Sequence, residues 1–195
     1  MNLRLPNAIA SGVMTLGLLA GGTAQATSVV NGGFETGDFN GWTQFGNFDS
    51  TNVDTTSPKS GLYAAYFGPG SVAGAGQTAG GPGGISQTLA TTAGASYTID
   101  FWLKNEGGPS NAFSVSWGGS EVSTLSLTDA SAFGYQHYSF TRIATAPSTA
   151  LAFTFRHDTA YWDLDNVSAV PEPTSMALMV AGLFAVLAAR RRQCT

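Results

Sequence analysis

Five side chains hold the positions from which this sequence could do chemistry. Trp102 lies in a stretch of alternating apolar and polar residues, with Asp100 and Lys104 two positions to either side. Side chains two apart in a strand share a face, so these three point together, away from the apolar side. His137 and Arg156 hold non-core positions in two further alternating stretches, from which they could share that face. An aromatic ring flanked by hydrogen-bonding side chains can stack on the C–H groups of a sugar.

Two alternatives to a binding face stay open. A loop could cover Trp102, or other elements could pack on this side of the sheet. In either case Trp102 would contribute to packing rather than to ligand binding.

Catalytic motifs are scarce. The sequence has two histidines and no Gly-x-Ser-x-Gly motif, and its one cysteine, Cys194, lies close to the C-terminus. His157-Asp158 could lend two metal ligands, but adjacent strand residues point to opposite faces. We therefore expect no enzyme. A glycosidase pair of carboxylates stays formally open, because a sequence cannot show the separation of about 5–9.5 Å that such a pair needs.

The elements that position these residues are expected to be β-strands. Alternation with a period of two dominates 28–169, and no stretch there has a helical stripe. Short strands between Gly, Asn, Ser and Pro favour an all-β fold, an antiparallel β-sandwich of the jelly-roll type. Trp42 and Trp117 are expected in its core, whereas Tyr161 and Trp162 fit either face. The ten expected strands are 28–31, 42–48, 61–67, 84–90, 96–104, 113–117, 120–127, 137–140, 151–156 and 160–169.

Composition limits the classes of partner. Residues 27–169 carry 11 Asp and Glu against 4 Lys and Arg, a net charge of −7. That excess repels phosphate backbones, so we expect no nucleic-acid partner. Aromatic residues make up 11% of the chain, which argues for a packed core rather than disorder.

The N-terminus reads as a secretory signal peptide covering 1–26. Arg4 and the terminal amine precede a short apolar stretch, and Ala24 and Ala26 form a small-x-small cleavage site. We expect export through the Sec machinery and cleavage after Ala26. The alternative is a buried first helix, which four glycines would weaken.

The C-terminal segment, 170–195, has three parts in order. Pro171, Glu172 and Pro173 form a break that we expect to end sheet pairing. An uncharged apolar run, 174–189, is expected to be a single transmembrane helix, and Arg190–Arg192 follow it. At about 1.5 Å per residue the run spans only ~24 Å, which suggests a transient anchor.

This tripartite end resembles the PEP-CTERM sorting signal of Gram-negative bacteria. The resemblance implies that an inner-membrane exosortase recognises the Pro-Glu-Pro motif and removes the anchor. The product would then reach the cell surface or the extracellular matrix. A plain type I membrane anchor is the alternative.

The body of the chain, 27–169, resembles the galactose-binding-like jelly rolls found in many carbohydrate-binding modules. The resemblance rests on short pieces at 30–35, 41–42, 57–64, 85–89 and 163–167. Such domains often hold a structural calcium where the first and last strands meet. By resemblance, Glu35 and Asp165 would supply side-chain oxygens, and Gly33 and Lys59 backbone carbonyls. The alternative is that Glu35 caps a turn and Asp165 binds backbone amides.

Together these features predict a non-catalytic module that binds an exopolysaccharide outside the cell. A structural or adhesive matrix protein acting through protein–protein contacts is the first alternative, and an enzyme on matrix carbohydrate is the second.

Overall fold

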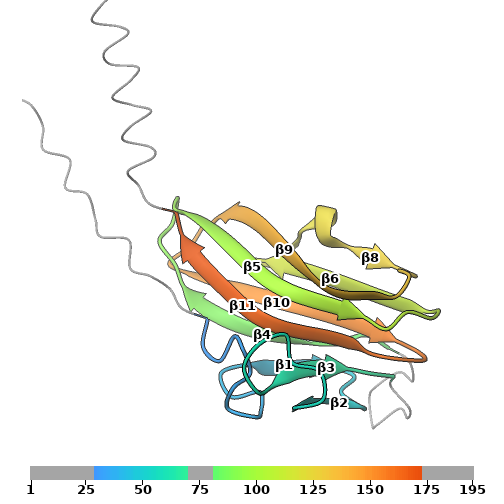
Figure 1. The fold of residues 1–195 in the computed structure, drawn as a ribbon. Helices are drawn as coiled ribbons and strands as arrows, with labels where there is room; N and C mark the ends of the chain where they lie inside the picture. The colour runs from blue at the N-terminus through green and yellow to red at the C-terminus, as the bar shows by residue number, and fades with distance from the viewer. Residues whose placement is uncertain (1–28, 70–80, 173–195) are drawn as a thin grey trace, which may run out of the picture.

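The computed structural model describes residues 29–69 and 81–172. This part of the chain forms two antiparallel β-sheets packed face to face (Figure 1), with one 3-10 turn at Ser123–Leu125 as its only helical element. The predicted all-β sandwich is therefore confirmed.

The first sheet has the strand order β1-β4-β10-β6-β7, and β8 also pairs with β6. Its central strand, β10, pairs with β4 along one side and with β6 along the other. The strands are β1 (Thr43–Gly46), β4 (Gly83–Ala90), β6 (Asn111–Trp117), β7 (Ser120–Glu121), β8 (Leu127–Thr128) and β10 (Ser148–His157).

The second sheet has the order β2-β3-β11-β5-β9. The last strand of the chain thus lies in the middle of the sheet, between β3 and β5. The strands are β2 (Thr51–Asp54), β3 (Ala64–Phe67), β5 (Ser96–Asn105), β9 (Phe133–Ile143) and β11 (Trp162–Pro171).

The core fills the space between the sheets, as the alternation predicts. Along β5 every second side chain is buried, from Tyr97 through Phe101 to Leu103, and each of these three is at most 1% exposed. Phe101 packs against Phe113 and Phe153 of the opposite sheet at ring distances of 5.7 and 5.1 Å. Burial of such large apolar side chains is the main force that holds two sheets together.

The tryptophans expected in the core are there, with Trp42 and Trp117 both buried. The structure also separates the adjacent pair: Trp162 is fully buried, whereas Tyr161 is 36% exposed.

The structure differs from the expected strands in three places. One expected strand is absent, a second is divided, and the structure has one strand that was not predicted. The stretch 28–31 is a turn where it is described, since Asn31 adopts a φ of 51°. The stretch 120–127 divides into β7, the 3-10 turn and the start of β8. Strand β2 was not predicted. It has four residues, of which only Val53 is buried, so it is too short to show an alternating pattern.

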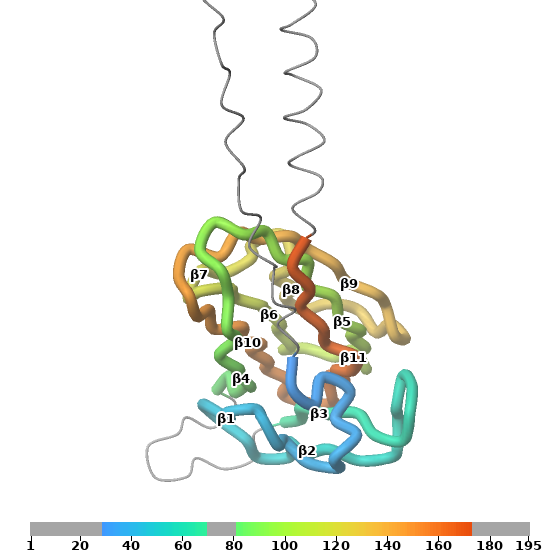
Figure 2. The backbone as a smooth tube through the Cα atoms, turned by 90° about the vertical axis from the view of Figure 1, so that its left-hand side faces the viewer, coloured from blue at the N-terminus to red at the C-terminus, as the bar shows by residue number. Residues whose placement is uncertain are grey.

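The first loop lies against the last strand. Gly32 O accepts a hydrogen bond of 2.8 Å from Val167 N, and a β-carbon at Gly32 would meet Val167 O at 2.0 Å. Only glycine fits there. Figure 2 shows the first described residues running beside β11. The two ends of the domain are thus tied without a disulfide.

Strand β11 also extends past the expected domain boundary at 169. Val170 and Pro171 pair with Thr98 and Tyr97 of β5, so the expectation that the prolines end sheet pairing is wrong for Pro171. Glu172 N donates to Ser96 O at 2.8 Å. Because backbone nitrogens alternate in direction along an antiparallel strand, the nitrogen of Pro171 faces away from β5. On its other side the β3 pairing stops at Leu164, so the missing N–H breaks no ladder bond.

The remaining predictions about the two termini lie outside the described residues. These are the signal peptide 1–26 with Ala24 and Ala26, Pro173, and the transmembrane segment 174–189. Within the ranges that the structure describes, no helix is long and apolar enough to cross a membrane.

Candidate functional site

The outer face of the second sheet gathers the polar side chains, and we call it the polar face. On β5 it presents Asp100, Trp102 and Lys104, as the alternation predicts. Strand pairing places Lys104 beside Asp163 of β11, and Trp102 between Asp165 of β11 and His137 of β9. Four of the five predicted binding residues therefore share one face.

The fifth predicted binding residue, Arg156, does not. It lies on β10 in the other sheet, and its guanidinium pairs with Asp158 at 2.8 and 3.0 Å. The prediction that Arg156 could share the face of Trp102 is wrong, because alternation separates inward from outward residues but cannot assign a strand to a sheet.

Trp102 is partly covered by its neighbours. The Lys59 ammonium, from the loop between β2 and β3, lies 4.2 Å from the centre of the indole, and the His137 ring lies 5.2 Å away. His137 Nε2 is 3.0 Å from Asp100 Oδ1, and the His137 side chain is 47% exposed. Trp102 is thus a half-buried ring with a cation over it. This agrees in part with the alternative that a loop covers Trp102.

A pocket opens on the polar face next to this group. Its volume is about 420 Å³, and Tyr66 and Tyr161 stand edge to face in its wall, with ring centres 5.7 Å apart. We call it the tyrosine pocket. It is lined by Asp54, Thr56, Ser57, Tyr66, Lys104, Glu106, Tyr161 and Asp163.

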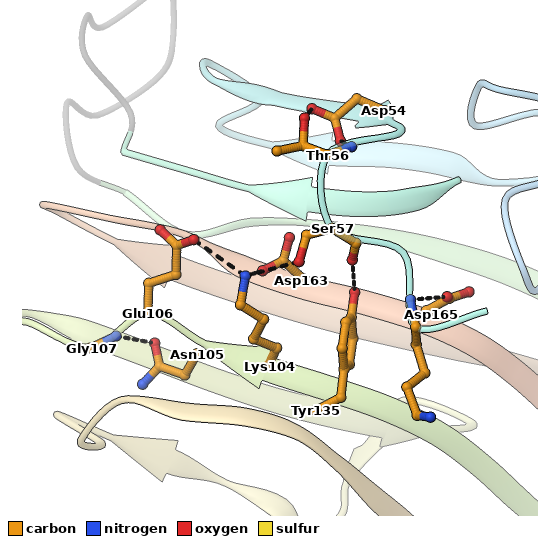
Figure 3. A network of polar contacts seen from close by, with 11 residues as sticks. Asp54, Thr56, Ser57, Lys104, Asn105, Glu106, Gly107, Tyr135, Asp163 and Asp165 are labelled. Carbon is orange, nitrogen blue, oxygen red and sulfur yellow. Dashed lines mark hydrogen bonds and ion pairs between the residues drawn. The ribbon is translucent and has the colours of Figure 1, made fainter. Parts of the chain in front are cut away.

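Lys104 is the polar centre of the tyrosine pocket. Its ammonium lies 3.0 Å from Asp163 Oδ2 and 3.3 Å from Glu106 Oε1, and it donates to Ser57 Oγ at 2.9 Å (Figure 3). Burial alone would lower the pKa of Lys104, but the Asp163 and Glu106 carboxylates outweigh that effect and raise it. Lys104 therefore stays a cation.

Asp163 lies beneath the Lys104 ammonium in the tyrosine pocket and is 5% exposed. Burial raises its pKa, and the opposing effect of Lys104 does not fully offset that rise. Its charge is held mainly by Lys104, a flexible side chain that also reaches two other partners.

Tyr135 fixes the loop that borders the pocket. Its hydroxyl donates to Ser57 O at 2.7 Å, so β9 holds the β2–β3 loop over the sheet. Burial, followed by the charges of Asp163, Asp165 and Asp54, raises the pKa of Tyr135 well above its usual range. The hydroxyl therefore remains protonated and keeps donating.

The residues predicted to bind calcium also converge, beside the first loop. Asp165 is fully buried and accepts amide hydrogen bonds from Lys59, Ser60 and Asn166 at 2.9, 3.1 and 2.6 Å. Glu35 accepts amide bonds from Leu62 at 3.1 and 3.2 Å. These contacts match the turn-and-amide alternative. Asp165 Oδ1 and Glu35 Oε2 each accept a single amide, so each keeps a lone pair that could face a cation.

The chemistry of this junction fits a hard cation such as calcium. Burial raises the pKa of Asp165, and the nearby Glu35 charge adds to that rise. A β-carbon on Gly33 would lie 3.5 Å from Asn166 Oδ1 and 3.9 Å from Asp165 Oδ1, so Gly33 lies among these oxygens. No three His, Cys, Asp or Glu side chains within 29–69 and 81–172 group as metal ligands, so backbone oxygens would have to complete the set.

The His157-Asp158 pair has a structural role instead. His157 is 2% exposed, and its Nδ1 accepts hydrogen bonds from the amides of Ala160 and Thr159 at 2.9 and 3.3 Å. Burial lowers the pKa of His157. Asp158 is occupied by Arg156, so the two side chains do not act together.

Sequence reasoning missed the two tyrosines and Ser57. Tyr161 lies just before β11, where alternation gives no direction, and Tyr66 lies on a strand of only four residues. Asp163 was visible only as part of the closing motif. The one available signal was its place two residues before Asp165, which puts it on the same strand face.

Comparison with known proteins identifies the C-terminal segment. Residues 169–192 match the PEP-CTERM protein-sorting motif. The chain carries a PEP-CTERM sorting signal. This signal indicates export and membrane-anchored sorting in Gram-negative bacteria, and it begins within the last three residues of β11.

Solved structures are similar to the domain in fold. TmCBM61, solved in complex with β-1,4-galactotriose, has a TM-score of 0.55 at 22% identity, over 74% of this chain and 99% of that one. The CBM22-1 xylan-binding domain from Paenibacillus barcinonensis Xyn10C has a TM-score of 0.50 at 16% identity, over 77% and 97% of the two chains.

The enzymatically active domain of bacteriophage CBA120 tailspike protein 4 is also similar. It has a TM-score of 0.54 at 17% identity, over 75% of this chain and 21% of that one. No curated protein matches the sequence. The likenesses show a β-sandwich shared with carbohydrate-binding modules.

Proposed function

We propose that this PEP-CTERM protein is a non-catalytic carbohydrate-binding module that holds an exopolysaccharide at or outside the cell surface. The observation that carries the proposal is the tyrosine pocket, where two tyrosine rings border a group of hydrogen-bonding side chains. Such a combination of ring faces and convergent polar groups suits a sugar ring.

Each part of the tyrosine pocket has a role in this proposal. Tyr66 and Tyr161 supply apolar surface for the C–H groups of a sugar. The three donors of Lys104 already face Asp163, Glu106 and Ser57, so Lys104 would exchange its Ser57 contact for a sugar hydroxyl. Glu106, which is exposed, would accept from another hydroxyl. Trp102, Asp100 and His137 lie on the same polar face and would contact a neighbouring unit of the polymer.

Two solved proteins of the same fold support the choice of ligand class. One is a complex with a galactotriose and the other is a xylan-binding domain.

The test is a polysaccharide pull-down with purified protein, followed by titration of any bound glycan. Tyr161→Ala and Lys104→Met should each weaken binding by about 10-fold or more, since each removes a contact of about 1.5–3 kcal/mol. Arg156→Ala removes a cation from the other sheet and is the matched control. Binding that is lost equally in Arg156→Ala, or no binding by folded protein, would contradict the proposal and favour a matrix protein acting through protein contacts.

We also propose that export follows the PEP-CTERM route. An exosortase would recognise the Pro-Glu-Pro motif at the inner membrane and release the domain toward the cell surface or matrix. Mass spectrometry of the exported protein should then find no peptide from residues 174–195, which follow the Pro-Glu-Pro motif. Arg190–Arg192 still attached to released protein would contradict this.

A structural calcium at the Glu35–Asp165 junction is a separate proposal. Glu35 and Asp165 would supply carboxylate oxygens, with backbone oxygens of Gly33 and Lys59. The ion would offset the repulsion between two carboxylates and tie the first loop to β11. EDTA should lower the melting temperature of the wild type and leave that of Glu35→Gln unchanged, because binding to the folded state alone raises stability. Identical melting of the wild type with calcium and with EDTA would remove the proposal.

A further inference from the structure

The sorting motif begins inside the folded domain. Strand β11 pairs with β5 through Pro171, which is buried, and the next residue, Glu172, continues the ladder by donating from its amide to Ser96 O at 2.8 Å. Two of the three residues of the Pro-Glu-Pro motif are therefore in contact with the sheet.

The Glu172 side chain is also bound. Its Oε1 accepts a hydrogen bond from Thr98 Oγ1 at 3.0 Å and faces Thr141 Oγ1 at 3.4 Å. The two hydroxyls lie 3.1 Å apart, on neighbouring positions of β5 and β9. Three strands of the second sheet thus meet at this carboxylate, which we call the Glu172 clasp.

The Glu172 clasp matters because it lies next to the apolar run in the sequence. Only Pro173 separates Glu172 from Thr174, the first residue of the apolar run. One residue spans at most about 3.6 Å of extended chain, so very little chain lies between the paired end of β11 and the apolar run. When the apolar run lies in the bilayer, a folded domain with β11 fully paired would lie directly against the site of processing.

We propose that the domain binds its own sorting motif through the Glu172 clasp, and that residues 170–172 must leave β5 before an exosortase can process the chain. The ligand of the clasp is the motif carboxylate itself, and the exosortase competes with Thr98 and Thr141 for it. This inference rests on the proposed exosortase processing and is independent of the proposed glycan site.

The end of β11 is suited to such an opening. Within the ranges that the structure describes, no strand pairs with the other side of β11 beyond Leu164, and Val170 is 54% exposed. Strand ends held by few, solvent-exposed contacts open with low free energy, while the rest of a sheet stays folded. The processing rate would then depend on the population of the open form.

The experiment follows processing of the full chain by pulse-chase in cells that contain an exosortase. Thr98→Val together with Thr141→Val removes both hydroxyls, keeps the β-branched shape and leaves the motif intact. We expect processing about 3–10-fold faster than wild type, since two exposed hydrogen bonds are lost. Thr88→Val, at an exposed position of the other sheet, is the control and should process at the wild-type rate.

A second variant tests the opposite change, in which a disulfide holds the end of β11 on β5. Its oxidised and reduced forms can be compared in one protein. Thr98→Cys with Val170→Cys places two thiols on paired positions of β5 and β11, where antiparallel geometry allows a disulfide. With membranes that contain exosortase, the oxidised form should be processed at least 10-fold more slowly than the reduced form.

The outcomes separate the two proposals. Equal rates in the wild type, the double valine variant and both redox forms would overturn the inference while leaving exosortase processing intact. A wild type that is never shortened in these cells would overturn the processing proposal, and this inference with it.

Discussion

Two aspartates on β11, two residues apart and on the same polar face, hold their charge in different ways. Asp163 is balanced mainly by the Lys104 ammonium, a flexible side chain shared with Glu106 and Ser57. Asp165 is balanced by three backbone amides, which are fixed by the fold. A side-chain partner can turn toward a ligand, whereas backbone amides cannot leave without opening the loop. The region around Asp163 is therefore suited to binding, and the region around Asp165 to holding the domain together.

The largest expected effect comes from breaking the Asp165 region. Asp165→Ala should lower the free energy of unfolding by about 3–5 kcal/mol, because it removes the buried acceptor of three amide hydrogen bonds and leaves a cavity under the loop. Urea unfolding measures this. Asp100→Ala, whose carboxylate is partly exposed and pairs with His137, is the control and should cost about 1 kcal/mol or less. Equal losses in the two variants would remove the distinction between the regions.

A smaller loss is expected on breaking the Asp163 region. Lys104→Met leaves Asp163 with no cation and should cost about 2 kcal/mol at pH 7, less than a fully buried pair because the Lys104 side chain is 24% exposed. Glycan binding should fall in the same variant by about 10-fold or more. A Lys104→Met protein with wild-type binding would show that the pocket is not the site.

The pH dependence of stability sharpens the comparison. The folded-state pKa values of Asp163 and Asp165 are both raised, chiefly by burial. The folded protein therefore keeps protons at pH values where the unfolded chain has released them. The stability from these two groups is fully present below the ordinary pKa of Asp, about 3.9, and is lost as the pH rises through the raised values.

We expect the stability of Asp163→Asn to decline less with rising pH than that of the wild type. Between about pH 4 and 7, its urea midpoint should fall less than that of the wild type, because one of the two titrating groups is gone. Parallel pH profiles for the two proteins would contradict the raised pKa of Asp163.

The smallest expected effect concerns the loop that joins the two regions. Tyr135→Phe removes only the hydrogen bond to Ser57 O and should cost about 1 kcal/mol in urea unfolding. Tyr138→Phe is the matched control, because that hydroxyl donates to the exposed Gln136 side chain. A larger loss in the control would mean that the loop is held by other contacts.

The sequence predicts the sandwich better than it predicts the site. Alternation along β5 places Trp102 and Lys104 on one outer face and Phe101 in the core, because side-chain direction in a strand is a local property. It could not place Arg156 on the correct sheet or bring Tyr66 next to Tyr161, since strand order depends on the whole chain. Pro171 was misassigned because its tolerance depends on which side of β11 lacks a partner.

The central claim is that the tyrosine pocket binds carbohydrate while the Asp165 region only supports the fold. The most direct measurement is calorimetric titration of one polysaccharide-derived oligosaccharide into the wild type, Tyr161→Ala and Glu35→Gln, each shown to be folded. The account predicts that Tyr161→Ala loses about 10-fold or more in affinity, whereas Glu35→Gln binds as the wild type does. Wild-type affinity in Tyr161→Ala, or a loss confined to Glu35→Gln, would contradict it.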